Sequence, residues 1–299
     1  MARRSDVCGA AYDHGIGVYG NLPRVHTAND EAVGGHMRSR ARLRYLDAFV
    51  AAIVVFLLAP IVVVLPSAFS SDVALSFPPQ GFSTRWFENL LSRGEFLSAA
   101  RLSITVAFLA TAISLIVGLF AAYALFRFDF WGRSALEALF MTPLVFPAIA
   151  LALSLAMVMS TAGLLRDFWG LLIAHVLITM PYAIRTIGAS LREISVAIED
   201  AALTLGARPA QLFWYVMLPL LRPGIAAGAI FSFIISMDEF TVSLFLTGPG
   251  LTTLPIEIFN YAEFNSDPTI ASISVILILI SCIAVATIER LMGLRRVLS

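Results

Sequence analysis

The chain has 299 residues, of which 59% are hydrophobic and 13% are charged. A soluble domain has about 45–50% apolar and about 25% charged residues, so the composition of this chain predicts a polytopic membrane protein. Twenty basic residues balance twenty acidic ones, so the net charge gives no indication of a nucleic-acid partner. Every basic residue is arginine, which excludes a lysine-containing phosphate-binding loop and predicts that any ATP cofactor is bound by a separate chain.

The N-terminal residues differ from the rest of the chain, because they are polar, rich in glycine and without periodicity. We expect residues 1–37 to form a disordered tail and residues 38–299 to form one membrane domain. Met37 directly precedes the run that leads into the first apolar segment, which favours the hypothesis that translation starts there; a regulatory tail is the alternative. The histidines of the tail have spacings that fit no known metal site, and we predict no metal site: His14, His26 and His36.

Six segments are long and apolar enough to cross a bilayer, which takes about 20 residues. They are residues 46–68, 98–126, 135–160, 169–190, 225–247 and 271–291. The predicted fold class is therefore an all-α membrane protein with six transmembrane helices. The first segment is longer than the apolar run of about 7–15 residues in a signal peptide, so we interpret it as a span.

Arginine placement predicts the orientation of these spans, because cytoplasmic connections carry an excess of basic residues. The arginine-rich stretches are the approach to the first span, residues 127–134, residues 191–224 and the C-terminal tail. The alternate connections are poorer in arginine, and residues 248–270 contain none. Both termini and the 191–224 connection are thus expected to face the cytoplasm.

The 191–224 connection carries two short apolar stripes at helical spacing. The first stripe consists of Ile194, Ala197, Ile198, Ala201, Ala202 and Leu205. Gly206 follows it where a helix C-cap glycine belongs, and Pro209 suits the first turn of a second helix. The second stripe consists of Leu212, Phe213, Val216, Met217 and Leu220, and it ends near Pro219, Pro223 and Gly224. The connection therefore predicts a helix, a sharp turn and a helix, with apolar faces that hold the two together.

The polar face of the first of these helices is acidic, which favours a protein partner over a helix lying on the bilayer surface, because surface helices are usually rich in basic residues. The sequence Asp200-Ala201-Ala202-x-x-x-Gly206, followed by Val216-x-Leu218-Pro219, resembles the EAA loop of ABC importer permeases, with Asp in place of Glu and Val in place of Ile at unchanged spacing. The resemblance extends from about residue 40 to the end. Residues 237–259, MDEFTVSLFLTGPGLTTLPIEIF, are similar to the second permease subunit of spermidine/putrescine importers.

This resemblance implies a type I ABC importer permease (MetI-like) fold in a bacterial inner membrane, with a cytoplasmic coupling helix-turn-helix. It implies as partners an ABC ATPase dimer, a second permease subunit, an external substrate-binding protein and the lipid bilayer. The coupling residues would be Glu199, Asp200, Ala201, Ala202, Gly206, Leu218 and Pro219. Asp200 would pair with a basic group of the ATPase. The implied substrate is spermidine or putrescine, with an amino-acid derivative or a phosphonate as the alternative.

Asp238 and Glu239 lie near the middle of the fifth predicted span, where a charged side chain costs about 2.5–3.5 kcal/mol on insertion scales. They are candidates for the translocation path; the alternatives are a structural pair bonded to neighbouring helices, or a break in the helix at this point. His175 stands alone in the fourth span, which is typical of a helix–helix hydrogen bond.

Two other classes of protein fit the sequence less well. An intramembrane enzyme is disfavoured because no H-E-x-x-H or G-x-S-x-G motif occurs, and adjacent carboxylates such as Asp238 and Glu239 diverge on a helix. We predict no catalytic residue. A self-contained secondary carrier usually shows internal repeats, and none is evident. The outer 248–270 connection is expected to be a structured loop, and the resemblance assigns it to the outer gate and the surface that docks the binding protein.

Overall fold

The computed structural model describes residues 29–73, 78, 79, 81–265 and 267–292, with the side chains of residues 29–46 and of a few residues near the C-terminus outside this description. These residues are almost entirely helical and form no strand; the extended pairs are the isolated bridges Ser70–Phe82 and Gly248–Leu251. The predicted disorder of residues 1–28 concerns a part of the chain outside the description, whereas Met37, the proposed translation start, lies within a described helix.

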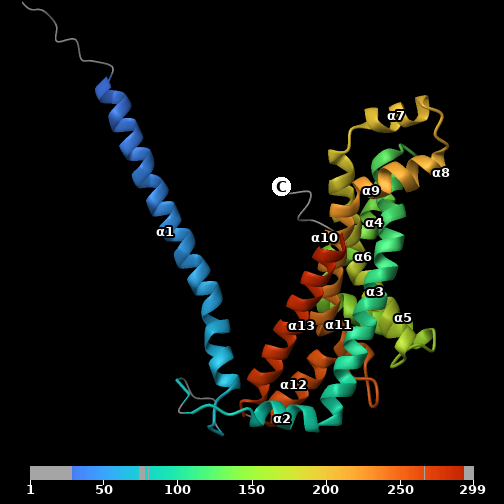
Figure 1. The fold of residues 1–299 in the computed structure, drawn as a ribbon. Helices are drawn as coiled ribbons and strands as arrows, with labels where there is room; N and C mark the ends of the chain where they lie inside the picture. The colour runs from blue at the N-terminus through green and yellow to red at the C-terminus, as the bar shows by residue number, and fades with distance from the viewer. Residues whose placement is uncertain (1–28, 74–77, 80, 266, 293–299) are drawn as a thin grey trace, which may run out of the picture. The chain divides into compact units, whose positions relative to one another are not determined.

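Fourteen helical elements follow one another along the described chain (Figure 1). They are α1 (Asn29–Ala68), α2 (Arg85–Ser92), α3 (Gly94–Arg127), α4 (Arg133–Val145), α5 (Ala148–Thr161), α6 (Phe168–Glu193), α7 (Val196–Thr204), α8 (Pro209–Gln211), the π-helix η1 (Leu212–Met217), α9 (Leu218–Leu220), α10 (Arg222–Asp238), α11 (Thr241–Leu246), α12 (Leu254–Phe264) and α13 (Thr269–Met292).

The chain divides into two units, residues 1–59 and 60–299. This boundary lies inside α1 and differs from the predicted boundary after residue 37. Helix α1 already begins at Asn29, so the last residues of the predicted tail are helical. The tail has no apolar periodicity of its own, but the adjoining helix extends into its residues 29–37.

Four helical segments are long and apolar enough to cross a membrane: Asp47–Ala68, Gly94–Arg127, Phe168–Glu193 and Thr269–Thr287. Two bent pairs raise the number to six if each pair is one span. The pair Arg133–Val145 and Ala148–Thr161 is bent by 110°, and the pair Pro209–Leu220 and Arg222–Asp238 by 66°. The first pair covers the predicted span 135–160. The second pair bends at Leu221, where residues of the predicted 191–224 connection meet α10. Four of the predicted spans correspond to the four long helices.

Two of the predicted spans are broken, which corrects the continuous helices expected at residues 135–160 and 225–247. The first breaks at Phe146, which is extended and directly precedes Pro147. A residue before proline is pushed out of the helical region, and proline has no N–H to donate. The second break follows Asp238, because Glu239 is extended and α11 begins only at Thr241. A hydropathy window averages over such breaks because both sides remain apolar.

Helices α3, α6 and α10 pack against one another at the centre of the 60–299 unit (Figure 1). Small residues allow this close approach, as is usual between membrane helices. A Cβ added at Gly118 of α3 would lie 2.9 Å from the Cβ of Ala183 of α6. A Cβ added at Gly228 of α10 would lie 2.8 Å from Oγ1 of Thr186 of α6. Around this centre, α11 packs on α5, and α13 packs on α10 and α2.

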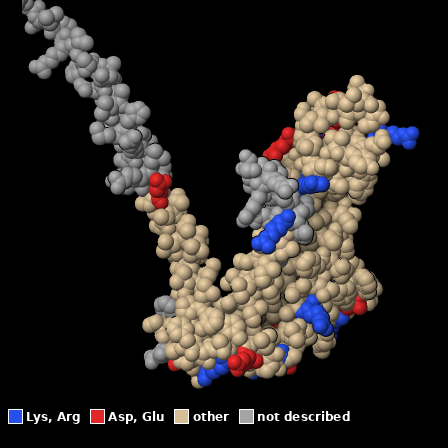
Figure 2. Space-filling model, in the orientation of Figure 1, with Lys and Arg blue, Asp and Glu red and all other residues tan. Residues whose placement is uncertain are grey.

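The surface of the 60–299 unit is largely uncharged. Figure 2 shows broad uncharged areas on the face drawn, with acidic and basic side chains along the edge where α2 and α12 lie and others toward the opposite end, near α7 and α8. Many large apolar side chains of α3 and α5 are exposed within this unit, including Phe108, Phe120 and Met157. Such surface suits lipid or another membrane helix.

Candidate functional site

The α7–α9 segment (Val196–Leu220) forms the predicted helix, turn and second helix at one end of the 60–299 unit (Figure 1). Helix α7 ends at Thr204, and the next turn closes with hydrogen bonds from Gly206 N to Leu203 O (2.9 Å) and from Ala207 N to Ala202 O (3.0 Å). This is a Schellman motif, which requires a left-handed residue after the helix. Gly206 has φ +88, so the predicted C-cap role of this glycine is confirmed.

The second half of the segment is wound more widely than the sequence suggests. Residues Leu212–Met217 form a π-helix, and the N–H of Leu218 bonds to the carbonyl of Phe213, five residues back. Pro219 explains this geometry, because its ring would crowd the carbonyl four residues earlier in a regular α-helix. Phe213 packs against Phe120 and Tyr123 of α3, with ring centroids 5.7 and 5.5 Å apart.

The first apolar stripe faces the opposite way from the prediction. Within this chain, most of its members are exposed, and Leu205 is 88% exposed. Other large apolar side chains of the segment are exposed too, together with Ile198 of the stripe: Val196, Ile198, Leu203, Trp214 and Tyr215. We call these residues, with Leu205, the apolar tip. The inward side of α7 instead carries Glu199 and the partly buried Ala202.

Glu199 anchors α7 to the end of α3 through a buried ion pair. Its Oε1 lies 2.6 Å from Nε of Arg127, and the two side chains are 12% and 11% exposed. Arg127 also donates from Nη2 to the carbonyl of Ile194 (2.8 Å), and the hydroxyl of Tyr123 lies 3.5 Å from the second carboxylate oxygen. Arg127 therefore contacts both the link between α6 and α7, at Ile194, and α7 itself, at Glu199. The sequence reasoning treated Arg127 only as an orientation signal.

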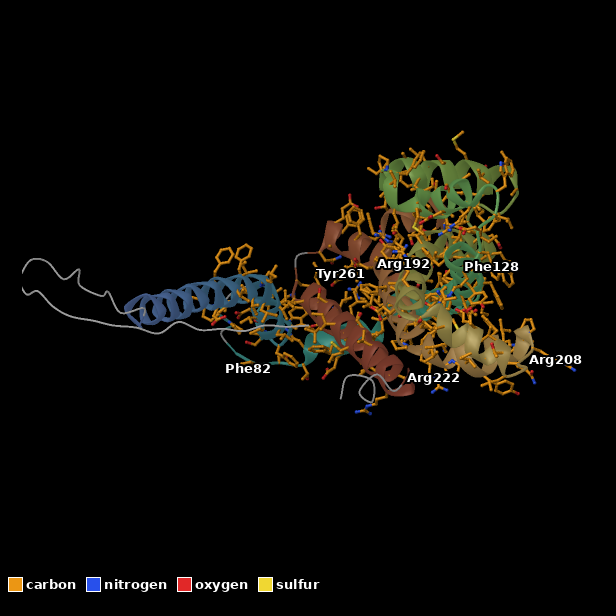
Figure 3. All side chains as sticks on the ribbon, turned by 90° about the horizontal axis from the view of Figure 1, so that it is seen from above. Phe82, Phe128, Arg192, Arg208, Arg222 and Tyr261 are labelled. Atoms are coloured by element: carbon orange, nitrogen blue, oxygen red, sulfur yellow. The ribbon has the colours of Figure 1, made fainter. Side chains whose placement is uncertain are left out.

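The other residues predicted to couple to an ATPase have mixed exposure. Asp200 and Ala201 are exposed, Ala202 is partly buried, and Leu218 and Pro219 are partly buried at the start of α9. Among the described residues, no hydrogen bond or ion pair engages the carboxylate of Asp200. Arg208 lies at the edge of the molecule, apart from Arg192 and Arg222 (Figure 3). The exposed acid is thus Asp200, whereas the adjacent Glu199 is used within the chain.

The two helix breaks meet at one cavity of about 250 Å³. Pro143, Leu144 and Phe146 reach it from the first break, and Asp238 and Glu239 from the second. The rest of its lining comes from α5, α6, α10 and α11: Ala148, Leu151, Ile178, Tyr182, Ile234, Ile235 and Val242. Interrupted helices in transporters typically line binding sites or wet cavities, because free backbone groups need polar partners there. The sequence reasoning missed Tyr182 and the first break, although Pro143 and Pro147 signalled it.

The two acids of this cavity are held differently. Glu239 is partly buried and accepts a hydrogen bond at Oε1 from the N–H of Val242 (2.9 Å), which satisfies an amide at the start of α11. Asp238 is exposed at the end of α10, and no hydrogen bond or ion pair joins its carboxylate to a described residue. The helix break considered from sequence is present in the structure, between Asp238 and Thr241.

His175 of α6 is buried, at 2% exposed, and contacts both sides of the second break. Its Nδ1 lies 2.8 Å from Oγ of Ser236 on α10, and its Nε2 lies 3.2 Å from Oγ of Ser243 on α11. The expected helix–helix hydrogen bond is therefore present, and it links three helices rather than two.

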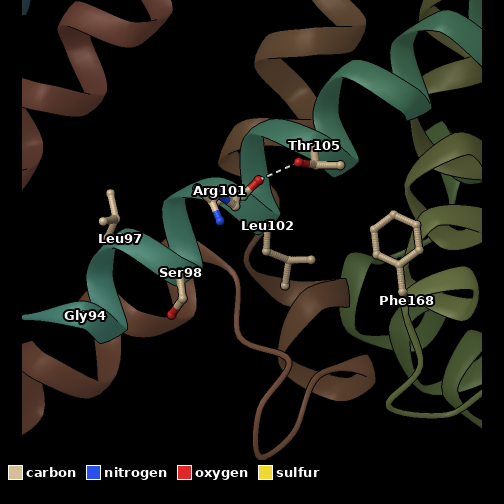
Figure 4. Close-up of a pocket in the computed structure, with 7 residues that line it drawn as sticks. All are labelled: Gly94, Leu97, Ser98, Arg101, Leu102, Thr105 and Phe168. Carbon is tan, nitrogen blue, oxygen red and sulfur yellow. Dashed lines mark hydrogen bonds between the residues drawn. The ribbon is translucent and has the colours of Figure 1, made fainter.

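The opposite end of the 60–299 unit has two further cavities. One of about 420 Å³ is lined by one face of α3 and by Phe168 of α6 (Figure 4), and it contains none of the predicted site residues. The other, of about 230 Å³, contains Glu95 and Glu257 beside the turn at Gly250. Burial, and then the charge of Glu95, raise the pKa of Glu257 above its ordinary value. The predicted structured loop of residues 248–270 contains α12, which begins at Leu254.

Comparison with known proteins identifies the family. Residues 114–296 match the family described as "Binding-protein-dependent transport system inner membrane component". The chain belongs to this family. The spermidine/putrescine permease PotC of Escherichia coli K12 is 31% identical over 79% of this chain and 89% of its own. The putrescine permease PotI of the same strain is 32% identical over 75% of this chain and 82% of its own.

Solved structures support the fold of this permease. A bacterial ABC transporter that imports alginate contains a chain with a TM-score of 0.66, 21% identity, and coverage of 85% of the permease and 97% of that chain. A methionine ABC transporter gives a TM-score of 0.54 at 20% identity, over 69% of the permease and 96% of that chain. The family and the relatives thus make the chain a multi-pass, non-catalytic inner-membrane component of a binding-protein-dependent transport system, and the solved structures give it the fold of type I ABC importer permeases.

Proposed function

We propose that the permease imports a polyamine such as spermidine or putrescine, or a related small organic cation, along a path that includes the cavity at the two helix breaks. The observation that carries this proposal is that Asp238 and Glu239 line the cavity and no arginine does. Carboxylates at a poorly solvated site attract an ammonium group strongly, whereas a phosphonate would meet only like charge. The names of the relatives PotC and PotI support the same substrate class.

Asp238→Asn is expected to raise the KM for spermidine uptake by about tenfold or more, the factor for losing a hydrogen bond to a charged group. Asp238 is the better test of the two acids, because no hydrogen bond or ion pair joins its carboxylate to a described residue, whereas Glu239 caps α11. The measurement is uptake of labelled spermidine into proteoliposomes that contain the whole importer. Glu263→Gln on α12 removes an exposed acid outside the cavity and is the matched control.

Assembly of each variant is measured by co-purification of the subunits. An Asp238→Asn complex that assembles normally and takes up spermidine with an unchanged KM would exclude a role of this carboxylate in the path. Uptake of an anionic phosphonate in preference to spermidine by the unmodified importer would refute the substrate class itself.

We also propose that the apolar tip and Asp200 form the surface on which the ATPase dimer docks. The apolar tip supports this, since large exposed apolar residues gathered on one segment typically mark a protein interface. The free carboxylate of Asp200 supports an ion pair with a basic group of the partner. The absence of lysine also supports a separate ATPase, because the nucleotide site must then lie on another chain.

The remaining partners and the orientation belong to the same proposal. Both termini and the α7–α9 segment would face the cytoplasm, as the arginine distribution indicates. A second, different permease subunit would supply the other half of the path, and an external binding protein would deliver the substrate. A mild-detergent purification of the tagged permease should retain an ATPase and a second permease. Retention of neither, under conditions that preserve other membrane complexes, would favour the secondary carrier.

A further inference from the structure

We infer that His175 is a positioning residue for the acidic cavity: as the neutral tautomer with its proton on Nε2, it bridges α10 and α11 across the helix break. The assignment of the hydrogen bonds is independent of the substrate, whereas the consequence for transport rests on the function proposed above.

The break needs an external tie because only Glu239 and Phe240 connect the two helices. No continuous ladder of backbone hydrogen bonds fixes the direction of α11 relative to α10. His175 lies on α6 and bonds to Ser236, two residues before the end of α10, and to Ser243, two residues after the start of α11. It therefore contacts the last turn of one helix and the first turn of the other.

The direction of each hydrogen bond follows from Ser243. Its hydroxyl donates to the carbonyl of Glu239 (2.7 Å), which uses its only proton. The oxygen of Ser243 can then only accept from His175, so Nε2 must carry a proton. In a neutral ring the other nitrogen is an acceptor, so the hydroxyl of Ser236 donates to Nδ1. The result is a single chain of hydrogen bonds that runs from Ser236 through His175 and Ser243 to the backbone carbonyl of Glu239.

Burial favours this neutral form over a doubly protonated ring. Ser236 and Ser243 are 4% and 0% exposed, and a charge placed between them would be far from water. A second tie lies one turn further along α6, where the hydroxyl of Ser232 donates to the carbonyl of Thr179 (3.3 Å). The two ties hold α10 against α6, and the hydrogen bond at Ser243 joins α11 to α6, while α11 also packs on α5.

The bridge fixes a residue that lines the cavity, Glu239. The chain of hydrogen bonds ends on the carbonyl of Glu239, while the carboxylate of Glu239 caps α11 at Val242. Both ends of this residue are thus fixed, and the adjacent Asp238 is held at the end of α10. Without the bridge, the packing of α11 on α5 still holds its far end, where the N–H of Arg166 bonds to the carbonyl of Leu246. The end of α11 next to the break loses its hydrogen bond to α6, so the two carboxylates are fixed less firmly around the cavity.

The tautomer can be read by ¹⁵N solid-state NMR of the full chain in lipid bilayers, labelled at histidine. His14, His26 and His36 are replaced by Asn, so that His175 is the only histidine left. We expect a protonated Nε2 and an unprotonated Nδ1, with Ser243→Ala shifting the first resonance and Ser236→Ala the second. A proton on Nδ1, in either the other tautomer or the charged ring, would overturn the inference.

The positioning role is tested by spermidine uptake in the whole importer. Ser243→Ala and His175→Leu both break the hydrogen bond that joins α11 to α6, so each should raise KM by about fivefold, the factor expected for one net hydrogen bond, and the double variant no further than either. His175→Gln should restore most of the affinity, because a glutamine amide supplies one donor and one acceptor. Thr247→Val is the matched control, since the Thr247 hydroxyl bonds the carbonyl of Ser243 within α11.

Unchanged KM values in His175→Leu, or a His175→Gln importer no better than the Leu variant, would show that the bridge does not position the site. If the unmodified importer does not transport spermidine, the proposed substrate fails. The NMR experiment would still test the bridge in that case, so the two failures can be told apart.

Discussion

Gly206→Asp is expected to leave the permease inserted and assembled while reducing ATP-dependent uptake by roughly a hundredfold, to near background. Within the chain the substitution costs little, because a Cβ at this position meets no atom within 4 Å. The left-handed backbone at φ +88 adds strain of about 1–2 kcal/mol. At the proposed interface the effect is larger, because a carboxylate beside the apolar tip would be buried without a partner. Uptake and substrate-stimulated ATPase activity are measured on the same purified complex.

Gly132→Asp is the matched control for this experiment. Gly132 has φ +85 and equally open space, but it lies between α3 and α4, outside the α7–α9 segment. It therefore suffers the same backbone strain without altering the proposed docking surface, and we expect near-normal uptake. If substrate-stimulated ATPase activity in the Gly206→Asp complex equals that of the unmodified complex, the α7–α9 segment does not couple hydrolysis to transport.

Arg127→Ala has the second largest expected effect, because it leaves the buried carboxylate of Glu199 without its partner. Removing one member of a buried ion pair costs about 3–5 kcal/mol, and the exposure of these side chains to about one-tenth favours the lower end of this range. The link between α6 and α7 also loses its hydrogen bond at the carbonyl of Ile194. We expect a lower Tm of the purified permease and faster proteolysis between residues 195 and 208.

The double variant Arg127→Met, Glu199→Leu should recover most of this stability, since replacing both members removes the unpaired charge. Arg133→Ala is the matched control, because Arg133 pairs with Asp129 on the surface, where the two side chains are 35% and 96% exposed. An exposed pair contributes at most about 1 kcal/mol. Equal effects of Arg127→Ala and Arg133→Ala would mean that the Glu199 ion pair does not anchor α7.

The helix, turn and helix of the α7–α9 segment could be predicted because its signals are local. Gly206 supplies the left-handed residue that ends α7, and Pro209 begins α8 with a φ suited to the first turn. Both effects depend on a few neighbouring residues, so a single sequence is enough to find them. The π-helix before Pro219 was not predicted, although the same proline causes it.

The direction in which α7 faces could not be predicted from periodicity. An apolar stripe usually faces the core of its own chain, but Leu205 and Ile198 are exposed and Glu199 is buried. The reason is a side chain far away in the sequence, Arg127, which gives the buried carboxylate a partner. A stripe that faces a partner protein looks the same in a sequence as one that faces the core.

The sequence by itself determined the class of this protein: its composition and apolar segments specify an all-helical membrane protein, Gly206 and Pro209 mark a helix, turn and helix, and the resemblance to the EAA loop identified a permease. Only the tertiary structure decided where the spans break and that Glu199, rather than Asp200, forms an ion pair within the chain. It also decided that Asp238, Glu239 and Pro143 line one cavity. Hydropathy and turn chemistry act within a few residues. Ion pairs and cavities depend instead on helices brought together from distant parts of the chain, which no local pattern encodes.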